Sequence, residues 1–292
     1  MPPSPGRRGE GREGARREHI VTSNLLRVSV LGISGRMGKA LLAALDEISN
    51  AQLSGASASA ASQWLGKDVS ACAAGSPRNV SITADPASAV KGATVAVDFT
   101  LPAATVTNLR ACVAARCPLV IGTTGHDAAT LAEVERAARE IPVLLSANMS
   151  LGVNLLLKLA ELTARALGEN YDVEIFEAHH RNKKDAPSGT ALALGNSVAL
   201  GRGVALADVA DYARHGQTGA RRPGAIGFSV FRGGDVIGDH TVTFAGSGER
   251  IELTHRASDR LTFARGAVRA AQWIVGRAPG LYSMQDVLGL SP

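Results

Sequence analysis

A short apolar run at Leu26–Leu31 leads directly into the glycine-rich turn GISGRMG at residues 32–38, and a helical stretch then continues to about Ile48. Strand, glycine turn and helix in this order form the opening unit of a dinucleotide-binding fold. Gly32 permits the tight turn, Gly35 lets the backbone approach a pyrophosphate, and Gly38 lets the helix pack on the sheet. The motif alone is weak, because a glycine-rich turn without a ligand has the same pattern.

Strand-like apolar runs recur along the next hundred residues, with helix-like segments between them. The runs are Asn79–Thr83, Ala93–Phe99, Pro118–Gly122 and Pro142–Ser146, and the helix-like segments are Ala87–Lys91, Ala103–Ala115 and Ala128–Arg139. This alternation predicts an α/β fold of the Rossmann type, with a doubly wound parallel sheet.

Three predicted strands end in turns that are rich in small polar residues. These turns are Asp98–Thr100, Gly122–Gly125 and Ser146–Ser150. The carboxyl ends of parallel strands are where open α/β sheets bind ligands. Each turn taken singly is equally well explained by ordinary turn chemistry. Three such turns at one edge of the sheet favour a binding site.

The pattern changes after Asn148 and predicts a second, α+β domain with a mixed sheet. A long helix is expected at Leu151–Leu167, a strand at Asp172–Ala178, then a polar loop and a helix from about Gly189. The rest of this part is β-rich, with runs at Ile226–Arg232, Asp239–Ala245 and Glu249–Arg256, and the helix Phe263–Val275 is expected to return to the first domain. We therefore predict a disordered extension at 1–24, a dinucleotide-binding domain at 25–150 and 261–292, and a substrate-binding and oligomerisation domain at 151–260.

Composition excludes several classes of protein. The net charge of +5 is spread over 292 residues, whereas nucleic-acid binding favours a concentrated basic patch. No run of 18 apolar residues occurs, so no membrane-spanning helix is expected. The three cysteines, Cys72, Cys112 and Cys117, show no CxxC spacing. They indicate reduced thiols in a cytoplasmic protein, and no metal site is expected.

The most informative segment is EAHHRNKKDAPSGTA at residues 177–191. It places two imidazoles, His179 and His180, directly before a run of cations, and Ser188 then begins a helix. A helix start binds anions, carboxylates among them. The segment predicts a dicarboxylate substrate. The alternative is a solvated charged loop. This alternative is less favoured because the segment adjoins a nucleotide-binding fold.

This segment resembles the signature of the 4-hydroxy-tetrahydrodipicolinate reductase (dihydrodipicolinate reductase) family. The other family segments occur in order: GISGRMG, DFT, GTTG, ANMSLGVN and GERIELTHRASDR, so that the resemblance covers roughly residues 25–290. It implies the NADPH- or NADH-dependent reduction of 4-hydroxy-tetrahydrodipicolinate to tetrahydrodipicolinate, in lysine and diaminopimelate biosynthesis. It also implies a homotetramer.

The resemblance implies roles for particular residues. His179 and Lys183 match the family's proton donors, and His180, Ser188, Gly189 and Thr190 match the substrate site. The cofactor would contact Gly32, Ile33, Ser34, Gly35, Arg36, Met37, Ser59, Gly122, Thr123, Thr124, Ser146, Ala147, Asn148 and Met149.

One position departs from the family pattern. The best-studied family members carry an acidic residue after the second strand, where it binds the adenosine ribose, but this chain has Ala58 and Ser59 there. A carboxylate would repel a 2′-phosphate, so its loss predicts that NADPH is used at least as well as NADH. Arg36 is the nearest cation in the sequence, and Lys67 is a more distant one.

Two other functions are compatible with parts of this pattern. A different Rossmann-fold dehydrogenase, acting on an amino acid or a semialdehyde, would need a nucleophilic cysteine or another acid–base set, and neither Cys112 nor Cys117 follows a strand at a helix start. A nucleotide-sensing protein without catalysis would keep the glycine turn but would not need the cluster of histidine and lysine residues.

Overall fold

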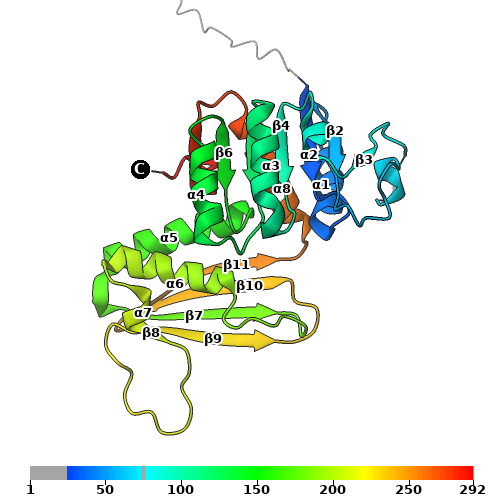
Figure 1. Ribbon diagram of the computed structural model, residues 1–292. Coiled ribbons are helices and arrows are strands. Elements are labelled where there is room, and N and C mark those ends of the chain that lie inside the picture. Colours follow the sequence, from blue (N-terminus) through cyan, green and yellow to red (C-terminus); the bar gives the residue numbers. More distant parts are fainter. Residues whose placement is uncertain (1–24, 74–75, 292) are drawn as a thin grey trace, which may run out of the picture.

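The computed structural model describes residues 25–73 and 76–291, which form two β-sheets with flanking helices (Figure 1). The predicted extension at 1–24 lies outside the described residues. The first sheet has seven parallel strands in the order β12-β6-β5-β4-β1-β2-β3. Its strands are β1 (Leu26–Leu31), β2 (Ala51–Ser57), β3 (Ile82–Thr83), β4 (Val95–Asp98), β5 (Leu119–Ile121), β6 (Pro142–Leu145) and β12 (Gly280–Tyr282).

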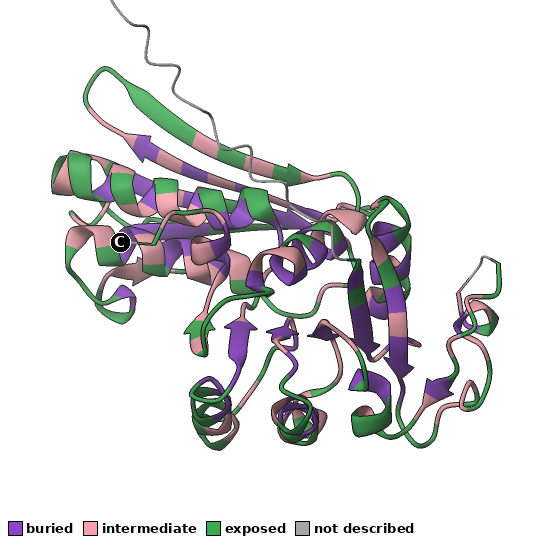
Figure 2. Ribbon diagram, turned by 90° about the horizontal axis from the view of Figure 1, so that it is seen from above, coloured by how far each residue is buried: buried purple, intermediate pink, exposed green. Residues whose placement is uncertain are grey.

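Helices cover both faces of this sheet, which confirms the doubly wound Rossmann-type fold. One face packs against α1 (Arg36–Asp46) and α8 (Leu261–Ile274), and the other against α2 (Pro86–Val90), α3 (Pro102–Ala114) and α4 (Ala128–Ala137). Most of the central strands are buried along their length, as Figure 2 shows. A strand buried on both faces must be apolar throughout, which is why these segments read as continuous hydrophobic runs.

Two details of the first sheet differ from the sequence prediction. The strand expected at residues 79–83 is only Ile82–Thr83, because the carboxylate of Asp68 accepts hydrogen bonds from the backbone N–H groups of Arg78 and Val80. The short strand β12 was not predicted. It pairs with β6 at the edge of the sheet and precedes α9 (Met284–Val287).

The second sheet has five strands in the order β11-β10-β7-β9-β8 and is mixed, as expected. Strands β7 and β9 are parallel, whereas β10 is antiparallel to both β7 and β11. The strands are β7 (Asp172–His179), β8 (Ala210–Asp211), β9 (Ile226–Arg232), β10 (Gly238–Ala245) and β11 (Arg250–Ala257), and the helices of this part are α5 (Leu151–Leu167), α6 (Gly189–Arg202) and α7 (Leu206–Val209). Short 3-10 turns occur at Val69–Ala71 and Gly168–Asn170.

Helices α5 and α6 cover one face of the second sheet, and no element of the described residues covers the other, open face (Figure 1). Val173 and Ile175 point toward the helices and are fully buried. Because side chains alternate along a strand, Phe176 points to the opposite face, where it is 44% exposed. Phe231 is 46% exposed on this same face. The open face thus presents two aromatic side chains to solvent.

Helix α8 follows the second sheet and returns to the first, as predicted. It starts two residues earlier than expected and packs against α1. Gly266 in α8 lies so close to the chain leaving β6 that a Cβ atom there would be 1.8 Å from the carbonyl oxygen of Met149. The two connections between the sheets therefore lie in contact. Among the described residues no helix is long and apolar enough to cross a membrane.

Candidate active site

The glycine turn is tight and packs closely against neighbouring backbone. Gly32 has a φ of +90°, and a Cβ atom there would lie 2.9 Å from the carbonyl oxygen of Phe99. A Cβ atom at Gly38 would lie 2.4 Å from the carbonyl oxygen of Gly32, so only glycine lets α1 start this close to the turn. Gly35 caps α1 without a side-chain hydrogen bond, which leaves the N–H groups of its first turn for an anion.

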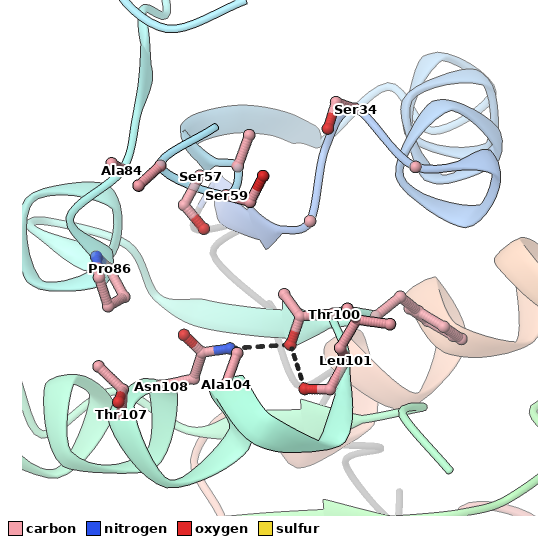
Figure 3. A pocket seen from close by; sticks show the side chains of 15 residues that line it. Ser34, Ser57, Ser59, Ala84, Pro86, Thr100, Leu101, Ala104, Thr107 and Asn108 are labelled. Atoms are coloured by element: carbon pink, nitrogen blue, oxygen red, sulfur yellow. Dashed lines mark hydrogen bonds between the residues drawn. The ribbon is translucent and has the colours of Figure 1, made fainter. Parts of the chain in front are cut away.

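A cavity of ≈ 450 Å³ lies beside this turn, at the carboxyl ends of β1, β2 and β4 (Figure 3). Its walls include the turn, the segment after β2 and the start of α3: Gly32, Ser34, Gly35, Ser57, Ala58, Ser59, Ala60, Ala84, Pro86, Phe99, Thr100, Leu101, Ala104, Thr107 and Asn108. All of these side chains are uncharged. The cavity lies at the switch point between β4 and β1, where doubly wound sheets bind nucleotides.

A buried carboxylate accepts several hydrogen bonds at the carboxyl end of β4, next to the cavity. Asp98 is fully buried at the end of β4, and its Oδ1 accepts hydrogen bonds from the backbone N–H and the hydroxyl of Thr100, at 2.8 and 2.6 Å. Asn108 donates to its Oδ2 at 3.0 Å. The hydroxyl of Thr123 donates to the carbonyl of Thr100 at 3.2 Å. The predicted segment Gly122–Thr124 is thereby tied to the end of β4.

The third predicted cofactor segment, Ser146–Met149, touches the predicted substrate helix. The side-chain amide of Asn148 donates to the hydroxyl of Thr190 at 3.1 Å, although the two residues are 42 apart in sequence. Asn148 also accepts a hydrogen bond from the N–H of Ser150, which caps α5. This contact joins the edge of the first sheet to the start of α6.

A pocket of ≈ 290 Å³ between the two sheets brings the remaining candidates together. Met37 of the glycine turn lines it from the first sheet, and His179, His180 and Lys183 line it from the second. Lys183 forms an ion pair with Asp185, with 2.9 Å between Nζ and Oδ1, and this pairing holds the pKa of the Asp185 carboxyl below its usual value.

Glu177 lies behind His179 and is fully buried. Its Oε2 lies 2.6 Å from Nδ1 of His179, and both of its oxygens accept hydrogen bonds from Arg232 at 2.8 Å. The N–H of Ser188 donates to Oε1 at 2.9 Å. Burial raises the pKa of the Glu177 carboxyl, but Arg232, His179 and Ser188 together outweigh it, and the pKa is lowered.

Ser188 is buried at the start of α6, where its hydroxyl caps the helix by accepting a hydrogen bond from the N–H of Ala191. The same hydroxyl lies 3.1 Å from Nε2 of His240. Burial, aided by the charge of His179, lowers the pKa of His240 to about 4. Gly189 and Thr190, by contrast, are exposed and half-buried, so that they form the accessible part of the helix start.

Sequence reasoning missed several residues of this region. Arg260, Ile237 and Phe263 line the pocket between the sheets, and nothing local in the sequence brings them there. Glu177 did carry a signal, because in the alternating pattern of β7 it continues the buried face of Val173 and Ile175. A carboxylate on an apolar face needs partners, which His179 and Arg232 supply.

Neither of the two predicted cations lines the nucleotide cavity. Arg36, the first residue of α1, is exposed and is absent from the cavity walls. Lys67 lies over the ring of Trp64, with Nζ 5.3 Å from the ring centroid. The three cysteines are buried and free, and the described part of the chain holds no cluster of His, Cys, Asp and Glu that would suit a metal ion.

A doubly wound sheet with a nucleotide cavity, facing a cationic and histidine-containing second domain, defines a dinucleotide-dependent oxidoreductase. Comparison with known proteins supports this class and identifies the family. The family models for the N-terminus and the C-terminus of dihydrodipicolinate reductase match residues 26–149 and 152–288. The chain belongs to the dihydrodipicolinate reductase family.

Individual relatives support this assignment along most of the chain. The 4-hydroxy-tetrahydrodipicolinate reductase of Thiobacillus denitrificans is 54% identical over 265 residues, which is 91% of this chain and 99% of the relative. The corresponding protein of Alkalilimnicola ehrlichii is 53% identical over 90% of this chain and 99% of its own. A dipicolinate-bound dihydrodipicolinate reductase from Paenisporosarcina has the same fold, with a TM-score of 0.72 and 22% identity, over 90% of this chain and 98% of that one.

Proposed function

We propose that this protein reduces 4-hydroxy-tetrahydrodipicolinate to tetrahydrodipicolinate with NADPH or NADH, as one step of lysine and diaminopimelate biosynthesis. The observation that carries the proposal is the pocket between the sheets, where Met37 of the glycine turn meets His179, His180 and Lys183. Relatives that are more than 50% identical are named 4-hydroxy-tetrahydrodipicolinate reductases, which supports the same reaction. Residues 25–150 and 261–292 would bind the cofactor, and residues 151–260 the substrate. Three free, buried cysteines favour a cytoplasmic enzyme.

The first part of the site would hold the nucleotide. Gly32 to Met37 would bind the pyrophosphate, Ser59 the adenosine ribose, and Gly122–Thr124 and Ser146–Met149 the nicotinamide half. The residues fit such a group, because a Cβ atom at Gly32 or Gly38 would close the turn against backbone oxygens. The bound nicotinamide would supply the hydride.

The second part of the site would bind the substrate and deliver a proton. Loss of water from the substrate gives a conjugated cyclic imine, and addition of a hydride places negative charge on the ring nitrogen. His179 or Lys183 would transfer a proton to that nitrogen, which balances the reduction. The start of α6, at Gly189 and Thr190, would bind one carboxylate together with His180. Ser188 would hold this helix start in place.

The reaction is tested by absorbance at 340 nm, with the substrate generated in situ by the preceding synthase. We expect NADPH oxidation that requires both the synthase product and this protein. A protein that binds NADPH but never oxidises it would instead be a nucleotide sensor, and oxidation with an unrelated amino acid or semialdehyde would indicate another dehydrogenase.

We predict that NADPH is used at least as well as NADH. Ser59 lies in a cavity whose walls carry no charge, so that nothing there repels a 2′-phosphate. Arg36 at the start of α1 is the cation proposed to reach the phosphate. A charge-assisted hydrogen bond contributes about 1.5–3 kcal/mol, which is roughly tenfold or more in affinity.

The measurement is kcat/KM for both cofactors at saturating substrate, in the wild type and in Arg36→Ala. We expect Arg36→Ala to weaken the use of NADPH and to leave NADH unchanged. Lys67→Ala is the control, because Lys67 is engaged with Trp64. A preference for NADH of more than about tenfold contradicts this interpretation of Ala58 and Ser59.

We infer a homotetramer assembled through the open face of the second sheet. Phe176 and Phe231 are exposed there, and large exposed apolar side chains on one surface commonly mark a site of protein–protein contact. Light scattering should give four chains per particle at micromolar concentration, and Phe176→Glu should reduce this number. The control is Leu200→Glu, since Leu200 is 65% exposed on α6, on the other side of the sheet. A monomeric wild type would overturn this assignment.

A further inference from the structure

The pair of Glu177 and His179 lies at the join between the second sheet and the pocket. Nδ1 of His179 is taken by Oε2 of Glu177 at 2.6 Å, so Nε2 is the ring nitrogen left for the pocket that His179 lines. Gly238 makes room for this ring edge, because a Cβ atom there would lie 3.1 Å from Nε2. The carboxylate thus fixes which nitrogen of His179 is presented.

Glu177 also connects this imidazole to the rest of the site. Its Oε1 accepts the N–H of Ser188, the residue that caps α6. Arg232 donates to both of its oxygens and to the carbonyl of Asp185 in the polar loop. One buried carboxylate therefore holds the imidazole, the helix start and the polar loop in a fixed relation.

We propose that Glu177 is a positioning residue for His179: its carboxylate holds the ring with Nε2 toward the pocket and stabilises the imidazolium form that donates the proton. This inference rests on the proposed function and goes beyond it, because it assigns the titrating donor to the Glu177–His179 pair rather than to Lys183. The proton passes from Nε2 to the ring nitrogen of the reduced substrate, and the neutral imidazole that remains keeps its Nδ1–H bonded to Glu177.

Several charged and titratable groups face His179, and they act in opposite directions. They are Glu177 on its own strand, Arg232 on β9, His240 on β10, His180 and Lys183 in the polar loop, and Arg260 at the start of α8. Burial lowers the pKa of His179, Glu177 raises it, and Lys183 and Arg232 lower it. The net result is a pKa below the ordinary value, with Glu177 as the group that opposes the fall.

The substitution Glu177→Gln removes the negative charge at nearly constant side-chain size. The glutamine carbonyl oxygen still accepts a hydrogen bond from Nδ1–H, whereas its NH2 group replaces the oxygen that accepts from Arg232 and Ser188. Burial and two cations then act on His179 without an opposing charge. An opposite charge at this distance shifts a pKa by about 1–3 pH units, so the pKa of His179 should fall further. Because the protonated imidazole is lost as pH rises through its pKa, the falling limb of the rate profile should move to lower pH.

The experiment measures kcat/KM for the dicarboxylate from about pH 5 to about pH 9, at saturating NADPH. In Glu177→Gln we expect the falling limb to move down by about 1–3 pH units, with a loss of about tenfold or more at neutral pH. A purely structural role would scale the whole profile and leave the limb where it is. An unmoved limb would therefore overturn the proposal and leave Lys183 as the donor.

The matched control is Glu174→Gln. Glu174 lies on the same strand and is likewise paired with arginine, in its case with Arg214 at 2.6 Å and Arg221 at 3.1 Å, but it lies toward the other end of the strand from His179. Its pH profile should coincide with that of the wild type. A shift in Glu174→Gln equal to that in Glu177→Gln would show a general effect of charge and would contradict the assignment.

If Glu177→Gln fails to fold, a second variant tests the proposal, because it should shift the falling limb of the pH profile in the opposite direction. Arg232→Met removes a cation that lowers the pKa of His179, so its falling limb should move to higher pH, whereas Arg232→Lys should keep the wild-type limb. Titration of the His179 ring by NMR, which needs no turnover, should give the lowest His179 pKa in Glu177→Gln, an intermediate one in the wild type and the highest in Arg232→Met. If the wild type fails to oxidise NADPH with this substrate, the proposed function fails, and the NMR titration still decides whether Glu177 governs His179.

Discussion

Replacing Lys183 with alanine is expected to lower kcat by about 10²–10⁴-fold, a rise of about 2.7–5.5 kcal/mol in the activation barrier. The reason is that Lys183 lines the pocket between the sheets together with His179 and His180. There it would offset the charge of a dicarboxylate and the negative charge that develops during reduction. Groups that stabilise developing charge in this way commonly contribute about 10²–10³-fold each.

The neighbouring lysine provides the control for this substitution. Lys184 is exposed and is absent from the pocket walls, so Lys184→Ala should retain wild-type turnover. The Kd for NADPH should be nearly unchanged in Lys183→Ala, since Lys183 lies away from the nucleotide cavity. Near-normal turnover in Lys183→Ala, or an equal loss in Lys184→Ala, would remove Lys183 from its proposed role.

The substitution Gly266→Ala is expected to lower the free energy of unfolding by about 1–3 kcal/mol or more. The added Cβ atom would lie 1.8 Å from the carbonyl oxygen of Met149, less than a van der Waals contact, so α8 or the Met149 backbone must move. The buried face of α8 gives little freedom, because Ala267 and Ala270 are fully buried against the first sheet. Each kcal/mol corresponds to a fall of about 2–4 °C in Tm.

Gly189→Ala is the matched control for stability. Gly189 also lies in a helix, but a Cβ atom there would have no neighbour within 4 Å, and alanine is the better helix former. Its Tm should be equal to or above that of the wild type. The NADPH Kd of Gly266→Ala should also rise, because Met149 belongs to the proposed cofactor segment. A Tm for Gly266→Ala within about 1 °C of the wild type would contradict the tight contact.

The elements that the sequence predicted well carry their own boundary signals. Helix α5 begins and ends where expected, since Ser150 caps its first turn and Gly168 follows its last residue. The glycine turn was predictable because the residue type itself reports the backbone conformation, as the positive φ of Gly32 shows. The strands β9, β10 and β11 were found to within one residue at each end, because turns rich in glycine separate them.

What the sequence could not predict depends on distant parts of the chain. Strand β12 is three residues long, and only its pairing with β6 defines it as a strand. The contact between Asn148 and Thr190 joins the loop after β6, in the first sheet, to the start of α6, which covers the second sheet. Arg260 lines the pocket because it precedes the first residue of α8, and tertiary packing places the start of this helix next to the pocket. The site could therefore be predicted as separate segments, whereas its geometry required the fold.

The most direct test of the central claim follows hydride transfer from the cofactor into the substrate ring. NADPH that carries deuterium in place of the transferred hydride of the nicotinamide is mixed with the synthase-generated dicarboxylate and this protein. The mass of the product is then measured by mass spectrometry. We expect one deuterium in each molecule of tetrahydrodipicolinate and one NADPH oxidised per molecule of product. Oxidation of the cofactor without deuterium in the product, or no oxidation at all, would contradict the central claim.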